Sequence, residues 1–130
     1  MIADKKQQWK KRVELMQYFY SCLINDHNTK QIVTNVSKYK FDSEQKKVIK
    51  FFAENIQKIK LKIKSLLKET WTWERLSLIL RAISCLAYCE FFCSKLPKAI
   101  VIDQALVTCD HYSQSGDKSF LNAILDKLLV

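Results

Sequence analysis

Glycine and proline are almost absent from this chain, which contains only Gly116 and Pro97 among its 130 residues. A β-rich protein of this length needs many more of both residues to form its turns. The sequence therefore favours an all-α fold. Because this length is ordinary for one domain, residues 1–130 are expected to form a single helical domain. A lone glycine also excludes the glycine-rich phosphate loops of nucleotide-binding proteins.

The spacing of apolar residues predicts three helices in the first half of the chain. Apolar positions recur at helical spacing within residues 9–23, 29–39 and 48–66. The third helix follows Asp42, a residue type that caps helix starts. Lysines alternate with apolar residues in the segment 58–64, as they do in a strand, but the helical pattern continues on both sides of it. We therefore expect one long helix there.

Three more helices are expected in the second half. Thr72 is a capping residue ahead of a very apolar helix that extends to Ser94. Pro97 suits the start of the next helix, where no amide proton is needed. The buried side of that helix is expected to consist of Ile100, Ala105 and Leu106. The last helix is expected to run from Lys118 or Ser119 to the end of the sequence.

Positive charge is concentrated in one half of the chain. Residues 1–70 hold 16 basic and 7 acidic side chains, whereas residues 71–130 hold six of each, and the formal net charge is +9. Such an excess is typical of proteins that bind polyanions such as nucleic acid. The lysine-rich run 58–68 is a weaker indication, because exposed lysines commonly serve solubility.

The densest basic cluster surrounds Trp9 in the first predicted helix. Its members are Lys5, Lys6, Lys10, Lys11 and Arg12. Cations beside an aromatic ring are the ingredients of single-stranded RNA recognition. Cations at a helix N-terminus also oppose the helix dipole, which is unfavourable unless a ligand compensates. The cluster predicts an RNA-binding helix, and a merely solvated helix start is the alternative.

Three cysteines recur at every fourth position and so lie on one helix face: Cys85, Cys89 and Cys93. One zinc ion could not bind all three, because the outer pair is separated by about 12 Å along a helix. Free cysteine is a common small core residue, so we interpret these side chains as packing residues, with no metal or cofactor expected. Five cysteines, an odd number, also argue against a disulfide framework.

Nothing in the sequence indicates catalysis. His27 and His111 each stand beside an aspartate in segments expected to be loops, and no nucleophile or metalloprotease motif is present. We therefore expect no enzymatic activity and no catalytic residues. The first residues lack the apolar core of a signal peptide, and the most apolar stretch, 76–93, contains Arg81 and Glu90. These features predict a cytoplasmic protein without membrane association.

Ordered motifs in the second half resemble those of a known family. A tryptophan, an Arg-Leu pair and a Leu-Ala-x-x-Glu helix end are met by Trp71, Arg75, Leu76, Leu86, Ala87 and Glu90. A proline before an apolar run and a helix start are met loosely by Pro97, Ile100, Ile102, Asp103, Gln104 and Ala105. The pattern Phe-x-Asn-Gly-x-Leu-Asp is met by Phe120, Asn122, Leu125 and Asp126, with Ala123 in place of glycine. The family's basic first helix resembles Lys10, Lys11, Arg12, Met16, Gln17, Phe19 and Tyr20. Residues 71–130 are thus similar to the NusB family of transcription antitermination factors, and residues 25–69 match only in helical character.

The resemblance implies an all-α fold, a compact bundle of six or seven helices, and a non-enzymatic factor that binds RNA. The family binds the boxA element of nascent RNA, as in an rRNA leader, together with the ribosomal protein NusE. RNA contacts are implied for the basic residues of the first helix and for Lys118 and Phe120. Contacts with a protein partner of the transcription or ribosome machinery are implied for Arg75, Leu80 and Cys85. The family has Glu and Arg at the last two positions, so we expect NusE binding to be weak or absent.

Two other functions are compatible with the sequence. The chain could be a protein-interaction module that kept the fold, lost recognition of boxA and NusE, and docks through an uncharged face around Leu80 and Cys85. It could also serve as a detached RNA-guiding domain, similar to the NusB-like domain of some rRNA methyltransferases, because 130 residues are too few for their catalytic part.

The packing role of the cysteines leads to a direct test. Purified protein should contain zinc well below one equivalent by elemental analysis, because the thiols are expected to fill the core. A chelator should leave the thermal midpoint unchanged. Stoichiometric zinc together with a chelator-dependent fall of the midpoint would show that the cysteines bind metal.

Overall fold

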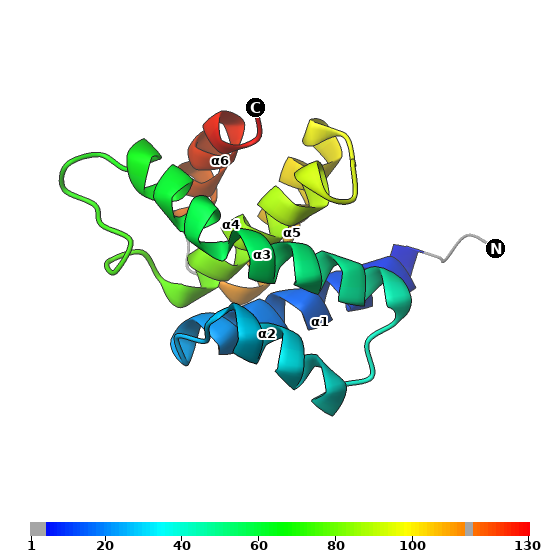
Figure 1. Cartoon of the computed structure of the whole chain (residues 1–130). Helices are drawn as coiled ribbons and strands as arrows, with labels where there is room; N and C mark the ends of the chain where they lie inside the picture. The colour runs from blue at the N-terminus through cyan, green and yellow to red at the C-terminus, as the bar shows by residue number, and fades with distance from the viewer. Residues whose placement is uncertain (1–4, 114–115) are drawn as a thin grey trace.

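The computed structural model describes residues 5–113 and 116–130, which form six α-helices and one short 3₁₀ helix (Figure 1). The elements are α1 (Lys5–Ile24), α2 (Thr29–Asn35), η1 (Val36–Lys38), α3 (Ser43–Leu66), α4 (Leu78–Phe92), α5 (Lys98–Tyr112) and α6 (Asp117–Leu128). These residues include no strand, so the predicted all-α class is confirmed. Among them, no helix combines the length and the apolar character that crossing a bilayer requires.

Reciprocal side-chain caps fix the starts of two helices. At the start of α2, the Asn28 side chain accepts a hydrogen bond from the Gln31 amide at 2.9 Å, and the Gln31 side chain accepts one from the Asn28 amide. Asp42 and Gln45 form the same capping box at the start of α3. The predicted cap at Asp42 is confirmed, and α3 continues through the segment 58–64 as one helix.

Helix α4 begins later than the sequence pattern suggested. Its cap is Ser77, whose hydroxyl accepts a hydrogen bond from the Leu80 amide at 3.2 Å. The predicted cap, Thr72, instead accepts a hydrogen bond from the Arg75 amide and closes a turn. The expectation for Thr72 is wrong because two residues of capping type precede the same apolar run, and periodicity does not choose between them.

Helix α5 follows Pro97 as predicted, but one residue of its buried side differs. Val101 and Ala105 are buried, whereas Ile100 is 49% exposed. Residues 99–102 are all apolar, so the sequence pattern did not define which of them faces the core. Helix α6 begins at Asp117, one residue before its predicted start.

Helix α4 lies at the centre of the molecule, and α1, α3, α5 and α6 pack around it. Every residue in the range 82–90 of this helix is buried. Phe19 of α1 and Phe52 of α3 stack with ring centroids 3.9 Å apart beside it. A helix that is covered on all sides cannot carry an unpaired charge without a large cost.

One ion pair lies within this core. Arg12 Nε of α1 is 2.7 Å from Glu90 Oε2 of α4, and the two side chains are only 16% and 11% exposed. Burial raises the pKa of Glu90, and the Arg12 guanidinium partly counteracts this rise. The pair fastens the first helix to the C-terminal part of the central helix.

We expect Arg12→Gln to lower the free energy of unfolding at pH 7 by about 3 kcal/mol, because Glu90 would remain buried without a cation. Lys10→Gln removes the same charge from an exposed position of the same helix, and should change stability by less than about 0.5 kcal/mol. Urea unfolding followed by circular dichroism measures both values. Equal losses in the two variants would contradict a special role for the pair.

The stability deficit of Arg12→Gln should depend on pH. A carboxyl group whose pKa is raised in the folded state supports stability below its unfolded pKa, and this support is lost as pH rises through the folded pKa. Without Arg12, the folded pKa of Glu90 should rise further. The deficit relative to the parent should therefore be largest at neutral pH and shrink as pH falls toward 4.5, the ordinary pKa of the group. Urea titrations at several pH values test this trend.

Candidate nucleic-acid interface

Three of the five predicted cations of α1 remain available to a ligand. Lys5, Lys6 and Lys10 are exposed, and none of them forms an ion pair with another residue that the structure describes. The first turn of α1 also contains no acidic residue. The positive end of the helix dipole adds to these charges, so this end of α1 attracts anions.

The other two cations are engaged within the fold. Lys11 Nζ is 2.9 Å from Asp42 Oδ2, and this pair raises the pKa of Lys11. The pKa of Asp42 is lowered first by the hydrogen bond from the Gln45 amide and then by Lys11. Arg12 is held by Glu90 in the core. The structure thus separates the predicted cluster into a free group of three lysines and two residues that connect α1 to its neighbours.

Trp9 connects the basic helix to the second half of the chain. Its ring lies 5.2 Å from the ring of His111 at an interplanar angle of 51°. His111 was expected in a loop, but it lies in the last turn of α5, where its Nδ1 is 3.0 Å from the Val107 carbonyl oxygen. The basic end of α1 and the C-terminal end of α5 are therefore neighbours, which the sequence did not reveal.

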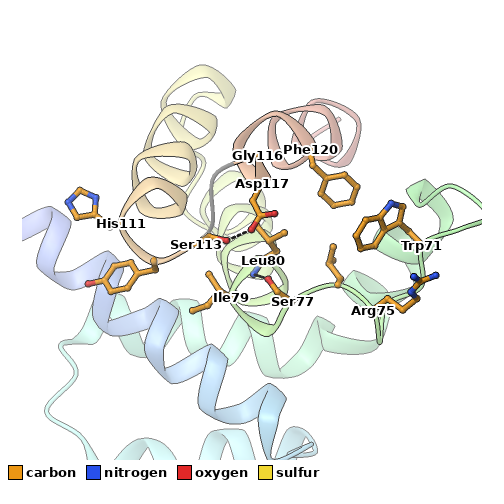
Figure 2. Close-up of a pocket in the computed structure, with 12 residues that line it drawn as sticks. Trp71, Arg75, Ser77, Ile79, Leu80, His111, Ser113, Gly116, Asp117 and Phe120 are labelled. Carbon is orange, nitrogen blue, oxygen red and sulfur yellow. Dashed lines mark hydrogen bonds between the residues drawn. The ribbon is translucent and has the colours of Figure 1, made fainter.

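A groove of about 720 Å³ begins beside this contact. Figure 2 shows how four segments surround it: the loop before α4, the start of α4, the end of α5 and the start of α6. Apolar side chains from the first two segments line part of it, namely Leu76, Ile79 and Leu80. Aromatic side chains contribute from three of the segments, namely Trp71, Tyr112 and Phe120. A groove of this size with aromatic lining suits flat rings such as nucleobases.

An aromatic pair and a cation form one end of the groove. Trp71 and Phe120 have ring centroids 5.3 Å apart, and Trp71 is 43% exposed. The Arg75 guanidinium lies 5.8 Å from the Trp71 ring, and its Nη1 donates a hydrogen bond to the Thr70 carbonyl at 2.8 Å. These contacts orient the guanidinium while leaving the residue exposed. Two lysines, Lys68 and Lys127, border a smaller hollow that also contacts the aromatic pair.

Acidic side chains lie in or near the part of the groove formed by α5 and α6. Ser113 donates a short hydrogen bond to Asp117, and the Lys118 ammonium is 2.9 Å from Asp110. Gly116 precedes α6 with a φ of 99°, a left-handed conformation that glycine adopts without strain. The Asp117 carboxylate makes this part of the groove unfavourable for anions.

The expectation that Leu80 and Cys85 form an exposed docking face is wrong. Their side chains are 4% and 0% exposed, because α4 is covered by the surrounding helices. Burial raises the pKa of the Cys85 thiol to about 12, so the group stays protonated at neutral pH. Leu80 reaches only the floor of the groove, whereas Arg75 lies at its rim.

Some residues of this interface were not identified as site residues from the sequence. The polar composition of residues 111–119 predicts a link between helices, whereas His111 and Tyr112 end α5 and Asp117 begins α6. An aromatic pair directly before the segment that holds the only glycine is the signal that could have indicated them. Of the predicted RNA contacts, Phe120 lines the groove, while Lys118 lies outside its lining and is paired with Asp110.

Comparisons with known proteins identify similarity to the NusB family. The sequence profile of the NusB family matches residues 10–129. The chain is 25% identical to the uncharacterized protein MG027 of Mycoplasma genitalium, with 98% of this chain and 95% of that protein covered. It is 36% identical to the transcription antitermination protein NusB of Pseudothermotoga lettingae, over 62% of this chain and 57% of that protein. A solved structure of T. maritima NusB superimposes with a TM-score of 0.77 at 25% identity, covering 99% of this chain and 92% of the other.

Proposed function

Because this chain belongs to the NusB family, we propose that it is a non-catalytic, RNA-binding factor of transcription antitermination. The relative from Pseudothermotoga lettingae is named for that process, and it supports the same role here. The proposed ligand is a single-stranded, boxA-like segment of nascent RNA such as an rRNA leader. The supporting observation is the aromatic groove, which the Trp9–His111 contact joins to the free lysines of α1.

The proposed binding mode divides the RNA between two kinds of surface. Bases stack on the aromatic rings of the groove, chiefly the exposed Trp71 and the half-buried Phe120, because stacking tolerates any base. Phosphates are neutralised by Lys5, Lys6 and Lys10, which have no carboxylate partner among the described residues. Both the basic helix and the aromatic groove then contact one strand.

The proposal gives Arg12 a positioning role in place of a phosphate contact. Its guanidinium is committed to Glu90, so a phosphate could recruit it only by leaving a buried carboxylate unpaired. By fastening α1 to α4, the pair keeps the exposed lysines beside the groove. The proposal includes no NusE contact at Leu80 or Cys85, because both side chains are buried.

A charge variant tests the phosphate contacts. Each contact to single-stranded RNA contributes about 0.7 to the slope of log affinity against log salt, so replacing Lys5, Lys6 and Lys10 with Gln should reduce that slope by about 2. Fluorescence anisotropy with a labelled RNA of about 12 nucleotides measures the slope. Lys58, Lys62 and Lys64 changed to Gln form the matched control and should leave it unchanged. The proposal fails if the parent binds no RNA, or if both triple variants behave alike.

An aromatic variant tests the stacking surface. Phe120→Ala should weaken RNA binding by about 1 to 3 kcal/mol while leaving the salt slope nearly unchanged, since stacking releases no counterions. Ile100→Ala is the matched control, because it also removes a partly exposed apolar side chain, near the opposite end of α5 from the groove. Thermal unfolding verifies that both variants are folded. An unchanged RNA affinity in folded Phe120→Ala would exclude stacking on this ring.

A further inference from the structure

The C-terminal half of α3 carries an exposed basic surface that the RNA proposal does not use. We call it the α3 ridge, and it consists of Lys58, Lys60, Leu61, Lys62 and Lys64. The surrounding segment, residues 55–68, contains five lysines and no acidic residue. No ion pair joins the ridge to any other described part of the chain. No carboxylate among the described residues therefore neutralises this local charge.

The ridge has a defined shape because its two lateral lysines are held by aromatic rings. Lys60 Nζ lies 5.6 Å from the centre of the Trp73 ring. Lys62 Nζ lies 5.4 Å from the Tyr88 ring and 5.0 Å from the Phe92 ring. These contacts restrain two long side chains before any partner arrives, which reduces the entropy lost on binding.

An apolar side chain occupies the middle of these cations. Leu61 is 66% exposed, and Lys58 and Lys64 are its neighbours one helical turn away on either side. At 100° per residue, Lys60 and Lys62 flank it on the two sides of the helix. A partner that fits this arrangement has to present both negative charge and an apolar contact.

These features do not suit single-stranded RNA. Strand binding needs open aromatic faces for the bases, but Trp73 and Tyr88 are only 5% and 3% exposed and lie beneath the lysines. Leu61 has no role against a phosphate backbone. The ridge also lies about 28 Å along α3 from Asp42, the residue that pairs with the basic part of α1. It is therefore a surface distinct from the basic end of α1.

We propose that the α3 ridge docks an acidic segment of a partner protein, which places one apolar side chain on Leu61 between its carboxylates. The four lysines provide charge complementarity and orientation, and the leucine provides the apolar contact at the centre. An amphipathic helix with leucine flanked by glutamates is the simplest segment with this chemistry. This surface and its partner do not depend on the proposed RNA function.

The test uses the full chain and a synthetic helical peptide that carries leucines on one face flanked by glutamates. Fluorescence anisotropy should show saturable 1:1 binding. Leu61→Gln should weaken it by about tenfold, because the central apolar contact is lost. The Lys58→Gln and Lys64→Gln double variant should also weaken it by about tenfold, because two charge contacts are lost. The double variant Lys46→Gln and Lys47→Gln is the matched control, because it removes the same charge from exposed positions of the same helix. It should bind as the parent does.

Two further arms separate this proposal from charge alone and from RNA binding. A peptide with the leucines changed to serine should bind about tenfold more weakly than the original. The labelled RNA should bind Leu61→Gln as tightly as the parent. The proposal is overturned if the peptide does not bind, if Leu61→Gln or the serine peptide has no effect, or if the control variant loses as much. It is also overturned if the ridge variants lose RNA affinity as strongly as the Lys5, Lys6 and Lys10 variant.

Discussion

The burial of α4 is the constraint on which the rest of the structure depends. Nine consecutive residues of this helix, 82–90, are buried, so every other long helix has to cover part of it. The only acidic residue in that stretch, Glu90, is tolerable because Arg12 reaches it from α1. The helices that cover α4 end and begin close to one another near its start. The groove described above lies between those helix ends.

The groove illustrates this relation between core and surface. Helix α5 ends and α6 begins beside the start of α4, and the loop from α3 enters from the opposite side (Figure 2). Four chain segments that meet at one place leave a hollow, because loops and helix ends pack less closely than helix sides. The rings of Trp71, Tyr112 and Phe120 line that hollow without being fully buried.

Much of the fold was predictable from the sequence, and what was not has identifiable physical reasons. Helical periodicity and Asp42 located α3 correctly, because a capping box and a regular apolar stripe are both local signals. The start of α4 was misplaced since Thr72 and Ser77 have the same capping chemistry. The burial of Cys85 agrees with the packing role expected from the sequence. Which helices cover it depends on contacts with distant parts of the chain, and no local pattern contains that information.

The candidate site was predictable in its charge but not in its geometry. Composition located the basic helix, and the family resemblance indicated Phe120 at the start of the last helix. Which lysines are free depended on long-range partners, because Asp42 and Glu90 are far from α1 in sequence. The approach of Trp9 to His111 also joins opposite halves of the chain. The spacing of residues along the sequence cannot predict such long-range contacts.

The reactivity of the buried thiols reports on opening motions of the protein. Alkylating reagents attack the thiolate, and burial keeps Cys85 and Cys89 protonated and out of reach in the closed structure. Each thiol therefore reacts only during an opening event, at a rate that reflects the population of the open form. Cys93 is half-buried at the end of α4 and reacts when that end frays, whereas Cys89 requires the central helix to separate from its neighbours. The ratio of the labelling rates of Cys93 and Cys89 therefore compares local fraying of α4 with unfolding of the whole core. A large ratio means that the end of the helix opens independently.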